Sequence, residues 1–275
     1  MNHRNINIKN MNILERIVDT KKTEIIARKM NLSENQLELI GDYHRVCNSL
    51  KDVLLQPGSS GIIAEFKQKS PSRGVINSSV TIDEVTSGYA LAGATGLSIL
   101  TDYEYFGGSL ADLVKAREGC PRLPVLRKDF IIDPYQVAEA KAFGADVILL
   151  IAACLEKNQA EMLAKKAKSL GLEVLMEIHN AEEIEKMNDF VDLVGVNNRN
   201  LKTMEVDVET SVKLADKLPA GCIKISESGL SSAKTINYLK DNGFKGFLIG
   251  ETFMKTKNPG EACRNLITEL GENAG

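Results

Sequence analysis

Several lysine and glutamate residues stand directly after short apolar runs of the sequence, where they could perform acid–base chemistry. Glu65 and Lys67 close the run that begins at residue 61, and Lys128 and Glu177 close two later runs. In an extended segment Glu65 and Lys67 lie on the same face, because successive side chains alternate. A lysine and a carboxylate in a partly desolvated pocket shift each other's pKa, as proton transfer requires. One charged loop residue means little, but repetition at the ends of several runs predicts an acid–base site.

Glycines that follow the last two apolar runs indicate a phosphate site. Gly229 and Gly250 stand at these positions, and a glycine lets backbone N–H groups approach an anion closely. Residues 251–255 predict a short helix, whose N-terminus would favour negative charge. The alternative is a pair of turn glycines that bind nothing.

The elements that must position these residues are eight short apolar runs, rich in β-branched residues, which are typical of strands covered on both faces. They span residues 61–66, 97–100, 124–127, 146–151, 173–177, 193–196, 222–225 and 246–249. Segments of helical character lie between them, among them 134–143, 158–170, 181–187, 208–217 and 232–242. Eight alternating units over residues 61–275 predict an α/β fold, a (β/α)₈ TIM barrel, whose active site lies at the C-terminal ends of the strands. A doubly wound open sheet is the alternative, but no G-x-G-x-x-G follows the first run.

Residues 1–60 predict a helical extension that packs on the barrel, so that residues 1–275 form a single domain. Residues 11–30 predict an amphipathic helix, because apolar residues recur there at helical spacing. Asn12 with Glu15 three residues later is a capping-box pattern at its start.

Composition narrows the classes of function. The net charge is −3, the chain has no Trp, and aromatic residues make up 5%, which argues against a nucleic-acid partner. No apolar run reaches the ~18 residues of a membrane span, and residues 1–10 lack the apolar core of a signal peptide. We therefore expect a cytoplasmic protein with no membrane partner. Five cysteines without a C-x-x-C motif indicate free thiols. The three histidines lack the spacing of metal ligands. His179 follows the fifth apolar run, so it could line the cavity, and the alternative that we favour is a loop histidine without a ligand role.

Seven segments together resemble the indole-3-glycerol-phosphate synthase family. The most specific is IIAEFKQKSPSRGVI at residues 62–76, and the others follow in order along the predicted barrel: LSILTDYEYFGGSLADL, PVLRKDFIIDPYQVAEAKAFGADVILLI, VLMEIHN, VGVNNRNL, ISESGL and LIGETFMK. The segment at residues 13–29 is similar to the additional N-terminal segment of the family. The resemblance implies a carboxy-lyase of tryptophan biosynthesis that acts on a phosphorylated small molecule, without metal or organic cofactor. We expect a monomer or weak dimer. The implied substrate is 1-(2-carboxyphenylamino)-1-deoxyribulose 5-phosphate, whose indole ring closes with loss of CO₂ and water.

The resemblance also implies a role for each matching residue. Lys128 corresponds to the general acid, Glu177 to the carboxylate that assists dehydration, Glu65 to the partner of a lysine, and Lys67 to a phosphate contact and possible second acid. The residues implied to position substrate hydroxyls and its carboxylate are Asn197, Arg199, Glu227 and Ser228. The residues implied to hold phosphate are Gly229, Gly250 and the backbone N–H of Glu251, with Ser70 nearby. Phe106 and Phe130 are expected to sandwich the aromatic ring, and the alternative is that they only anchor loops.

Three positions depart from the pattern of the family. Glu251 stands in place of Ser or Thr, Gly107 in place of a polar residue, and Asn200 in place of Asp. These departures put one hydroxyl contact, one loop contact and one ion pair in doubt, but no catalytic residue type is missing.

Three other functions remain open. Phosphoribosylanthranilate isomerase would need Cys and Asp as its acid–base pair. A class I aldolase would use Lys128 in a Schiff base, which borohydride would trap. A non-catalytic phosphate-binding barrel should have lost the charged residues at the ends of its strands, and this sequence retains them.

Overall fold

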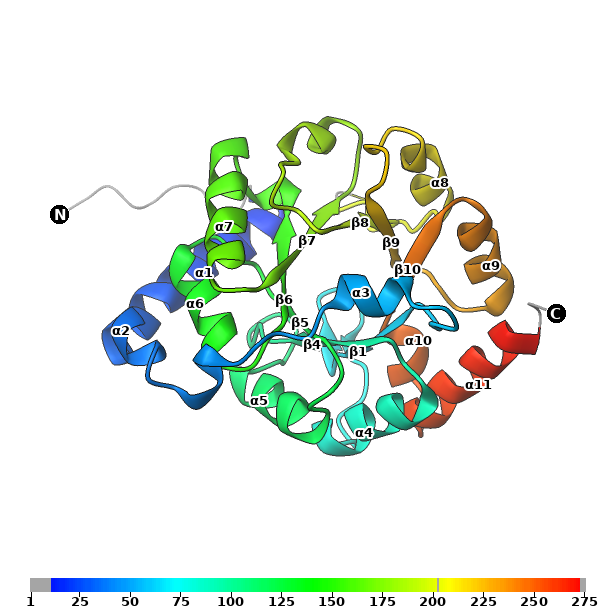
Figure 1. Ribbon diagram of the computed structural model, residues 1–275, viewed down its shortest axis with the longest axis horizontal. Helices are drawn as coiled ribbons and strands as arrows, with labels where there is room; N and C mark the ends of the chain where they lie inside the picture. Colours follow the sequence, from blue (N-terminus) through cyan, green and yellow to red (C-terminus); the bar gives the residue numbers. More distant parts are fainter. Residues whose placement is uncertain (1–10, 202, 273–275) are drawn as a thin grey trace.

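The computed structural model describes residues 11–201 and 203–272, and its centre is a closed barrel of parallel strands (Figure 1). The order around the barrel is β1-β10-β9-β8-β7-β6-β5-β4, and β1 pairs with both β10 and β4. The barrel strands are β1 Ile62–Phe66, β4 Gly96–Leu100, β5 Val125–Lys128, β6 Val147–Ile151, β7 Glu173–Ile178, β8 Leu193–Asn197, β9 Ile223–Glu227 and β10 Phe244–Ile249. Every predicted strand is confirmed to within two residues at each end. Closure rules out the doubly wound open sheet.

Helices surround the barrel. They are α4 Ile82–Ala92, α5 Leu110–Gly119, α6 Pro134–Ala142, α7 Lys157–Ser169, α8 Glu209–Ala215, α9 Ala233–Asp241, α10 Glu251–Met254 and α11 Pro259–Glu272, with the 3₁₀ helix η3 at Ala152–Cys154. One predicted helix is different in kind: the segment 181–187 forms the 3₁₀ helix η4, Glu182–Lys186. It is a short connector, the usual setting for 3₁₀ geometry.

Two apolar layers hold the barrel together. Outward side chains of the strands pack against the helices, and inward side chains such as Ile63, Leu126 and Leu175 fill the barrel. Each fully buried Leu or Ile stabilises the fold by ~1.5–3 kcal/mol. Helix α3, Leu50–Leu55, closes the N-terminal end of the barrel, because its Leu50 and Leu54 pack on the inner cluster (Figure 1). The site is therefore left to the opposite end.

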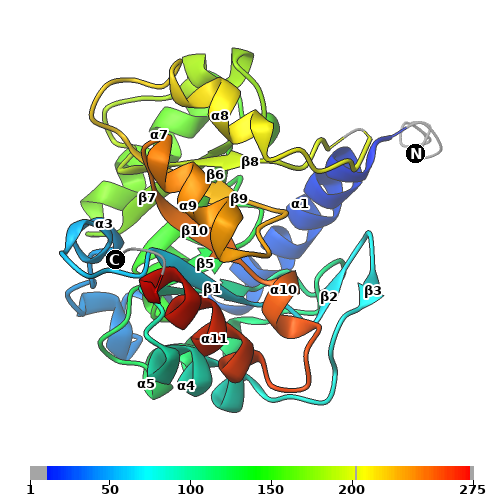
Figure 2. The ribbon, with the colours of Figure 1, turned by 90° about the vertical axis from the view of Figure 1, so that its right-hand side faces the viewer.

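The predicted N-terminal helix is α1, Ile13–Asn31, and its capping box is present. Asn12 accepts from the Glu15 N–H at 2.9 Å, and Glu15 accepts from the Asn12 N–H at 2.8 Å. Short elements connect α1 to α3: α2 Glu34–Leu37 and η2 Gly41–His44. Figure 2 shows α1, α10 and the small hairpin of β2, Lys69–Ser70, and β3, Gly74–Val75, at one end of the barrel, with α3 at the other. The N-terminal helix thus lies at the mouth of the barrel.

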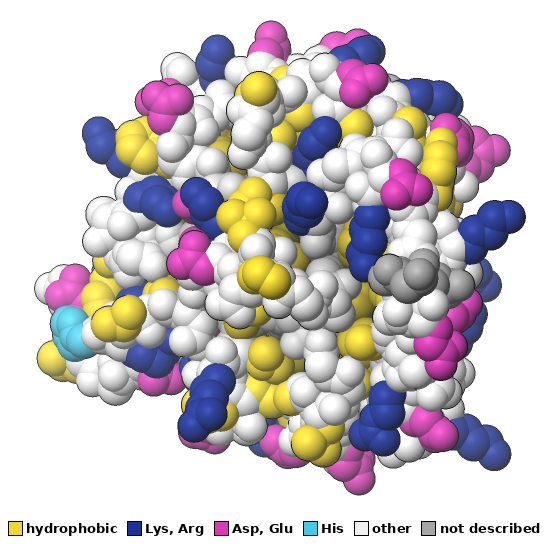
Figure 3. Space-filling view, turned by 45° about the vertical axis from the view of Figure 1, so that its right-hand side comes forward, with side chains coloured by type: hydrophobic (Ala, Val, Ile, Leu, Met, Phe, Trp, Pro, Cys, Tyr) yellow, Lys and Arg dark blue, Asp and Glu magenta, His cyan; other side chains and the backbone are white. Residues whose placement is uncertain are grey.

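Three further findings concern the rest of the molecule. Among residues 11–201 and 203–272, no helix is both long enough and apolar enough to cross a membrane. Acidic and basic side chains are interspersed over the face in Figure 3, which has no continuous basic stripe. The five cysteines are free thiols, as predicted. The polar segment 1–10, in which no signal peptide was expected, lies outside the described residues.

Candidate active site

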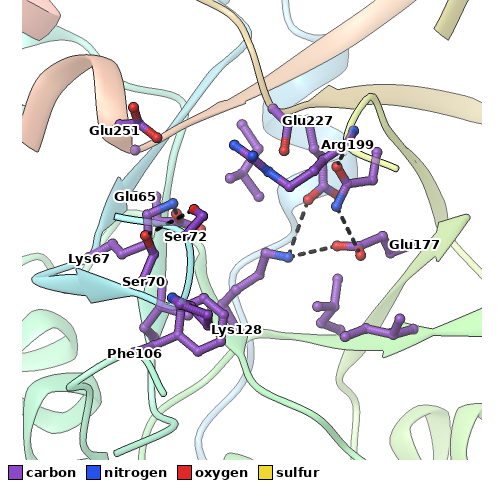
Figure 4. A pocket seen from close by; sticks show the side chains of 18 of the residues that line it. Glu65, Lys67, Ser70, Ser72, Phe106, Lys128, Glu177, Arg199, Glu227 and Glu251 are labelled. Carbon is purple, nitrogen blue, oxygen red and sulfur yellow. Dashed lines mark hydrogen bonds and ion pairs between the residues drawn. The ribbon is translucent and has the colours of Figure 1, made fainter. Parts of the chain in front are cut away.

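A cavity of about 200 Å³ opens at the C-terminal ends of the strands (Figure 4). All fourteen candidate residues lie on its wall, although they come from segments more than 180 positions apart. They are Glu65, Lys67, Ser70, Phe106, Lys128, Phe130, Glu177, Asn197, Arg199, Glu227, Ser228, Gly229, Gly250 and Glu251. The barrel brings them together because all eight strands run in the same direction, so that their C-terminal ends share one rim.

Lys128 at the end of β5 occupies the centre of the cavity, with only 15% of its side chain exposed. Its Nζ lies 2.7 Å from Oε2 of Glu177 and 3.3 Å from Oε2 of Glu227. Burial opposes the charge of this lysine, but Glu177, Glu227 and Glu65 outweigh burial and raise its pKa. Lys128 is therefore an ammonium that faces the cavity and can donate a proton there.

Glu177 and Glu227 both face Lys128, but they differ in protonation. Burial would raise the pKa of Glu177, but Lys128 and His179 outweigh it and hold that pKa well below its ordinary value. Burial, with Glu177 and Glu65 added, outweighs Lys128 at Glu227 and raises the pKa of that carboxyl. The site thus holds one ionised and one protonated carboxyl, the arrangement by which enzymes separate a base from an acid.

Glycine at position 195 makes room for Glu227. A Cβ on Gly195 would lie 2.2 Å from Oε1 of Glu227, a distance at which one of the two groups must move. Gly250 has the same relation to the carboxylate of Glu65, with a distance of 2.6 Å. Both glycines therefore belong to the construction of the site.

Glu65 and Lys67 form a second ion pair, at the end of β1. The Nζ of Lys67 lies 2.8 Å from Oε1 of Glu65, which confirms that alternation brings the two side chains together. The hydroxyl of Ser98 donates to the other oxygen of Glu65 at 3.3 Å. Glu65 is 3% exposed, so a buried carboxylate holds the side-chain nitrogen of Lys67 in position.

The glycine-rich rim lies beside α10, which occupies most of the short helix predicted at 251–255. Ser228 and Gly229 both have left-handed backbone conformations, with φ of 71° and 76°. For Ser228 this conformation costs ~1 kcal/mol or more, strain of a kind that clusters at functional sites. The carboxylate of Glu251 turns toward the hairpin, where its Oε1 lies 3.2 Å from Nη2 of Arg73. Its backbone therefore remains at the cavity while its charge is paired outside.

The opposite end of the cavity is apolar. Phe106 and Phe130 meet there, with ring centroids 6.0 Å apart and planes inclined by 36°. A flat ring between them would need two stacking gaps of ~3.5 Å each. The two rings contact each other in this structure, so a sandwich requires that they first move apart.

The N-terminal helix completes this apolar end, which the sequence analysis did not foresee. Ile13, Leu14 and Ile17 of α1 line the cavity beside Leu149 and Ile151 of β6. The helical spacing had predicted only that the stripe packs on the barrel, because spacing cannot tell a core from the wall of a cavity.

The contacts of two charged residues near the site were also not predicted. His179 is 7% exposed in its side chain, with Nε2 3.2 Å from Oε1 of Glu177. Lys21 of α1 is fully buried, and its Nζ lies 2.8 Å from Asp102 and 3.0 Å from Asp129. A signal existed for each: His179 follows Glu177 by two residues at a strand end, and Lys21 stands four residues from Ile17 within the apolar stripe.

Two departures from the family pattern have a place in the structure. Gly107 has φ of 68° and sits against Lys69, a left-handed conformation that suits glycine. The Oδ1 of Asn200 accepts from the Thr203 N–H at 3.2 Å, and Arg199 donates to the carbonyl of Met204 at 3.2 Å. Within the described residues, no group of three His, Cys, Asp or Glu side chains is placed to hold a metal ion.

Comparisons with known proteins agree on the family. The model of the family "Indole-3-glycerol phosphate synthase" matches residues 14–266. The indole-3-glycerol phosphate synthase of Bacteroides thetaiotaomicron is 47% identical over 258 residues, which cover 94% of this chain and 98% of the relative. That of Polynucleobacter asymbioticus is 41% identical over 264 residues, 93% of this chain and 98% of the relative.

Solved structures with little sequence identity share the fold. The 3-hexulose-6-phosphate synthase of Salmonella typhimurium has a TM-score of 0.61 at 13% identity, over 77% of this chain and 99% of its own. A mutant tryptophan synthase α-subunit from Pyrococcus furiosus has a TM-score of 0.56 at 15% identity, over 78% and 98%. These likenesses establish the barrel, whereas the extent and identity of the sequence matches establish more: the chain belongs to the indole-3-glycerol phosphate synthase family.

Proposed function

We propose that the chain closes the indole ring of 1-(2-carboxyphenylamino)-1-deoxyribulose 5-phosphate, which yields indole-3-glycerol phosphate, CO₂ and water. The observation that carries the proposal is the position of Lys128, whose Nζ is 2.7 Å from Glu177 and 3.3 Å from Glu227 between the two ends of the cavity. An aromatic ring fits the apolar end, a phosphate fits the glycine-rich end, and the reacting carbons then lie between them.

In the first step Lys128 acts as the general acid. Its ammonium polarises the C2′ carbonyl of the ribulose and protonates the oxygen as the ring carbon that bears the carboxylate attacks C2′. The new C–C bond interrupts the aromatic system, and departure of CO₂ restores the electron pair to the ring. The product of this step carries a hydroxyl at the former carbonyl carbon.

In the second step that hydroxyl leaves as water, and Glu177 accepts a proton. Its ionised state equips it as a base. Lys67 is the second acid near the ribulose, and its Nζ lies 2.8 Å from Oε1 of Glu65. Lys67 supplies the proton with which the hydroxyl leaves, and Glu177 takes the proton that C1′ loses as the C1′–C2′ double bond of the indole forms, so the step requires no external reagent.

The phosphate is assigned to the rim formed by Gly229, Gly250 and the backbone N–H of Glu251, with Lys67 and Ser70 beside it. The orientation of Glu251 supports this assignment. Its carboxylate is paired with Arg73 rather than directed at the rim, so it does not repel a phosphate bound there. Lys67 adds the positive charge that a phosphate dianion requires.

The remaining residues orient the substrate. Asn197, Arg199, Glu227 and Ser228 are assigned to its hydroxyls and carboxylate, and the protonated Glu227 supplies a hydroxyl donor. Phe106 and Phe130 are assigned to the aromatic ring. With their centroids 6.0 Å apart, the ring stacks on one of them or separates the two.

Three features of organisation belong to the same proposal. Residues 1–275 form one domain, in which residues 1–60 are a helical extension and 61–275 the barrel. The protein acts in the cytoplasm, as expected for an enzyme of tryptophan biosynthesis. It works as a monomer or weak dimer.

The test is the appearance of indole fluorescence when the pure protein meets the carboxyphenylamino-deoxyribulose phosphate without added metal. The chain contains no Trp, so the background is low. Lys128→Ala should lose several hundred-fold or more in kcat/KM, in the range of a lost general acid. Equal rates in both proteins would move the acid to another group, Lys67 first. A folded parent without any signal would reject the proposed reaction.

A further inference from the structure

His179 lies beside Glu177 and does not line the cavity. It follows β7 by one residue, so it extends from the same side of the strand as Glu177. Its side chain is 7% exposed, and it is not part of the cavity wall. It therefore reaches the substrate only through Glu177.

Both nitrogens of the His179 ring face carboxylates. Nε2 lies 3.2 Å from Oε1 of Glu177, as an ion-pair contact rather than an aligned hydrogen bond. Nδ1 lies 3.3 Å from Oε2 of Glu183. A carboxylate only accepts hydrogen bonds, so a neutral imidazole would direct a lone pair at one of them. The geometry calls for a proton on each nitrogen, which makes the ring a cation.

The carboxylate of Glu183 is fixed in its position beside His179 by hydrogen bonds. Its Oε2 accepts the backbone N–H of His179 at 2.8 Å, and its Oε1 accepts Nδ2 of Asn180 at 3.0 Å. Its own backbone N–H donates to Oδ1 of Asn180 at 3.1 Å. A fixed carboxylate thus holds His179 in place on the side away from the cavity.

The other titratable groups around His179 do not compete for its proton. Burial raises the pKa of Cys154 on η3 to about 12, so it remains a thiol. Lys186 on η4 donates to the carbonyl of Ala152 at 2.9 Å. Lys128 on β5 and Glu227 on β9 lie on the cavity side of Glu177. Burial opposes the charge of His179, but Glu177 and Glu183 outweigh it and raise its pKa to about 9.

Glu177 and Glu227 would otherwise be nearly equivalent. Both are glutamates at strand ends, both are nearly buried, and both face Lys128. Two carboxyls so close to one ammonium share a proton, because the second ionisation is opposed by the first. Glu177 has two partners that Glu227 lacks: Nδ2 of Asn197 donates to its Oε1 at 3.2 Å, and His179 places a second cation beside it. Oε1 of Glu227 has no hydrogen-bond partner among the described residues. Of the two partners of Glu177, only His179 adds a positive charge.

We propose that His179 decides the distribution of charge between these two carboxyls: it keeps Glu177 ionised and leaves the shared proton on Glu227. His179 is then a positioning residue, which acts through Glu177. The inference deepens the proposed function and rests on it, because Glu177 must be ionised only if it serves as the base. When Lys128 gives up its proton to substrate, His179 remains as the cation that keeps Glu177 able to accept one.

The first test does not depend on activity. Infrared spectroscopy at pH 7 detects the stretching band of a protonated carboxyl in the protein without substrate. In the parent, Glu227→Gln should remove this band. His179→Gln should split the band or change its position, because the proton then occupies Glu177 in part of the molecules, and Oε1 of Glu177 accepts from Nδ2 of Asn197 at 3.2 Å whereas Oε1 of Glu227 has no hydrogen-bond partner among the described residues. The inference is overturned if the band of His179→Gln is unchanged in position and intensity.

The second test uses the reaction. His179→Gln should shift the acid limb of the kcat/KM profile upward by about one pH unit or more, because an adjacent opposite charge lowers a carboxyl pKa by that amount. At pH values above this limb, KM should stay within about threefold of the parent. His44→Gln, at an exposed histidine, is the matched control and should shift nothing. An unchanged acid limb contradicts the inference.

Two safeguards keep these outcomes distinct. His179→Asn replaces His179→Gln if the longer side chain prevents folding, judged by circular dichroism and the melting temperature. A protein that makes no indole product but shows the expected band dependence would retain the inference about charge and reject only the proposed reaction.

Discussion

The Nζ of Lys21 lies 3.0 Å from Oδ1 of Asp129, and both side chains are completely buried. Asp129 follows Lys128 directly, and its other oxygen binds Arg127 at 3.0 Å. Lys21 also pairs with Asp102 at 2.8 Å, and Asp102 accepts the backbone N–H groups of Tyr105 and Phe106. One lysine of the N-terminal helix therefore connects the segment that carries the central ammonium with the loop that carries an aromatic ring of the cavity.

Lys21→Met should lower the free energy of unfolding by ~3–5 kcal/mol, the usual cost of leaving buried charges without their partner. Urea denaturation followed by circular dichroism measures it. Lys29→Met is the matched control, because Lys29 of the same helix pairs with Asp133 at 2.8 Å but is 45% exposed. The control should cost less than ~1 kcal/mol. Equal losses of unfolding free energy in the two variants would show that burial of the ion pairs of Lys21 does not increase their effect on stability.

Glu177→Gln and Glu227→Gln should differ sharply in activity. Glutamine reproduces the shape of a protonated glutamate, so the change at Glu227 should cost no more than about tenfold in kcat. The change at Glu177 removes an ionised base and should cost ~100-fold or more. Steady-state kinetics at pH 7 on both variants makes the comparison. A larger loss at Glu227 would reverse the assignment of base and proton carrier.

The stability that His179 contributes should depend on pH. Its pKa is raised from 6.5 to about 9 in the folded protein, so the folded state binds the proton more tightly. The contribution is therefore complete below about pH 6.5 and is lost as the pH rises through about 9. The difference in unfolding free energy between the parent and His179→Gln should fall by about 3 kcal/mol across that window. Chemical denaturation at intervals of one pH unit measures it, and a difference that stays constant would contradict the raised pKa.

Arg73 should improve phosphate binding by neutralising Glu251. Arg73→Ala frees a carboxylate beside the proposed phosphate rim, and KM should rise about two- to fivefold with kcat unchanged, as expected for an exposed pair. Glu251→Ser should remove this sensitivity, so that the double variant shows no further rise. Arg122→Ala, at an exposed arginine, should leave KM unaffected. A rise in the double variant as large as in Arg73→Ala alone would show that Arg73 acts elsewhere.

Much of the fold and the location of the site follow from sequence because each depends on a local pattern. Strands buried on both faces must be apolar along their whole length, and parallel strands must end together, so Glu65, Lys128 and Glu177 converge. The protonation states of the site residues cannot be predicted from the sequence in the same way, because they depend on contacts between segments that are distant in the chain. Nothing near Glu227 in sequence marks it as the protonated carboxyl, since the distinction comes from His179. Lysine is rarely buried, and the carboxylates that keep Lys21 buried stand 81 and 108 residues away.

Gly195 should prove as necessary to the site as the charged residues, because its missing side chain is the space that Glu227 occupies. Gly195→Ala would place a Cβ 2.2 Å from Oε1 of Glu227, and overpacking of this kind costs ~1–3 kcal/mol. The displaced carboxyl would also leave Lys128, so kcat should fall together with stability. Gly119→Ala, where a Cβ meets open space, is the control and should be neutral or mildly stabilising. Truncation by Glu227→Ala removes the obstacle, so Gly195→Ala should cost less stability in that background than in the parent. An undiminished cost would mean that the strand itself, rather than Glu227, excludes the side chain, and the argument that this glycine belongs to the site would fail.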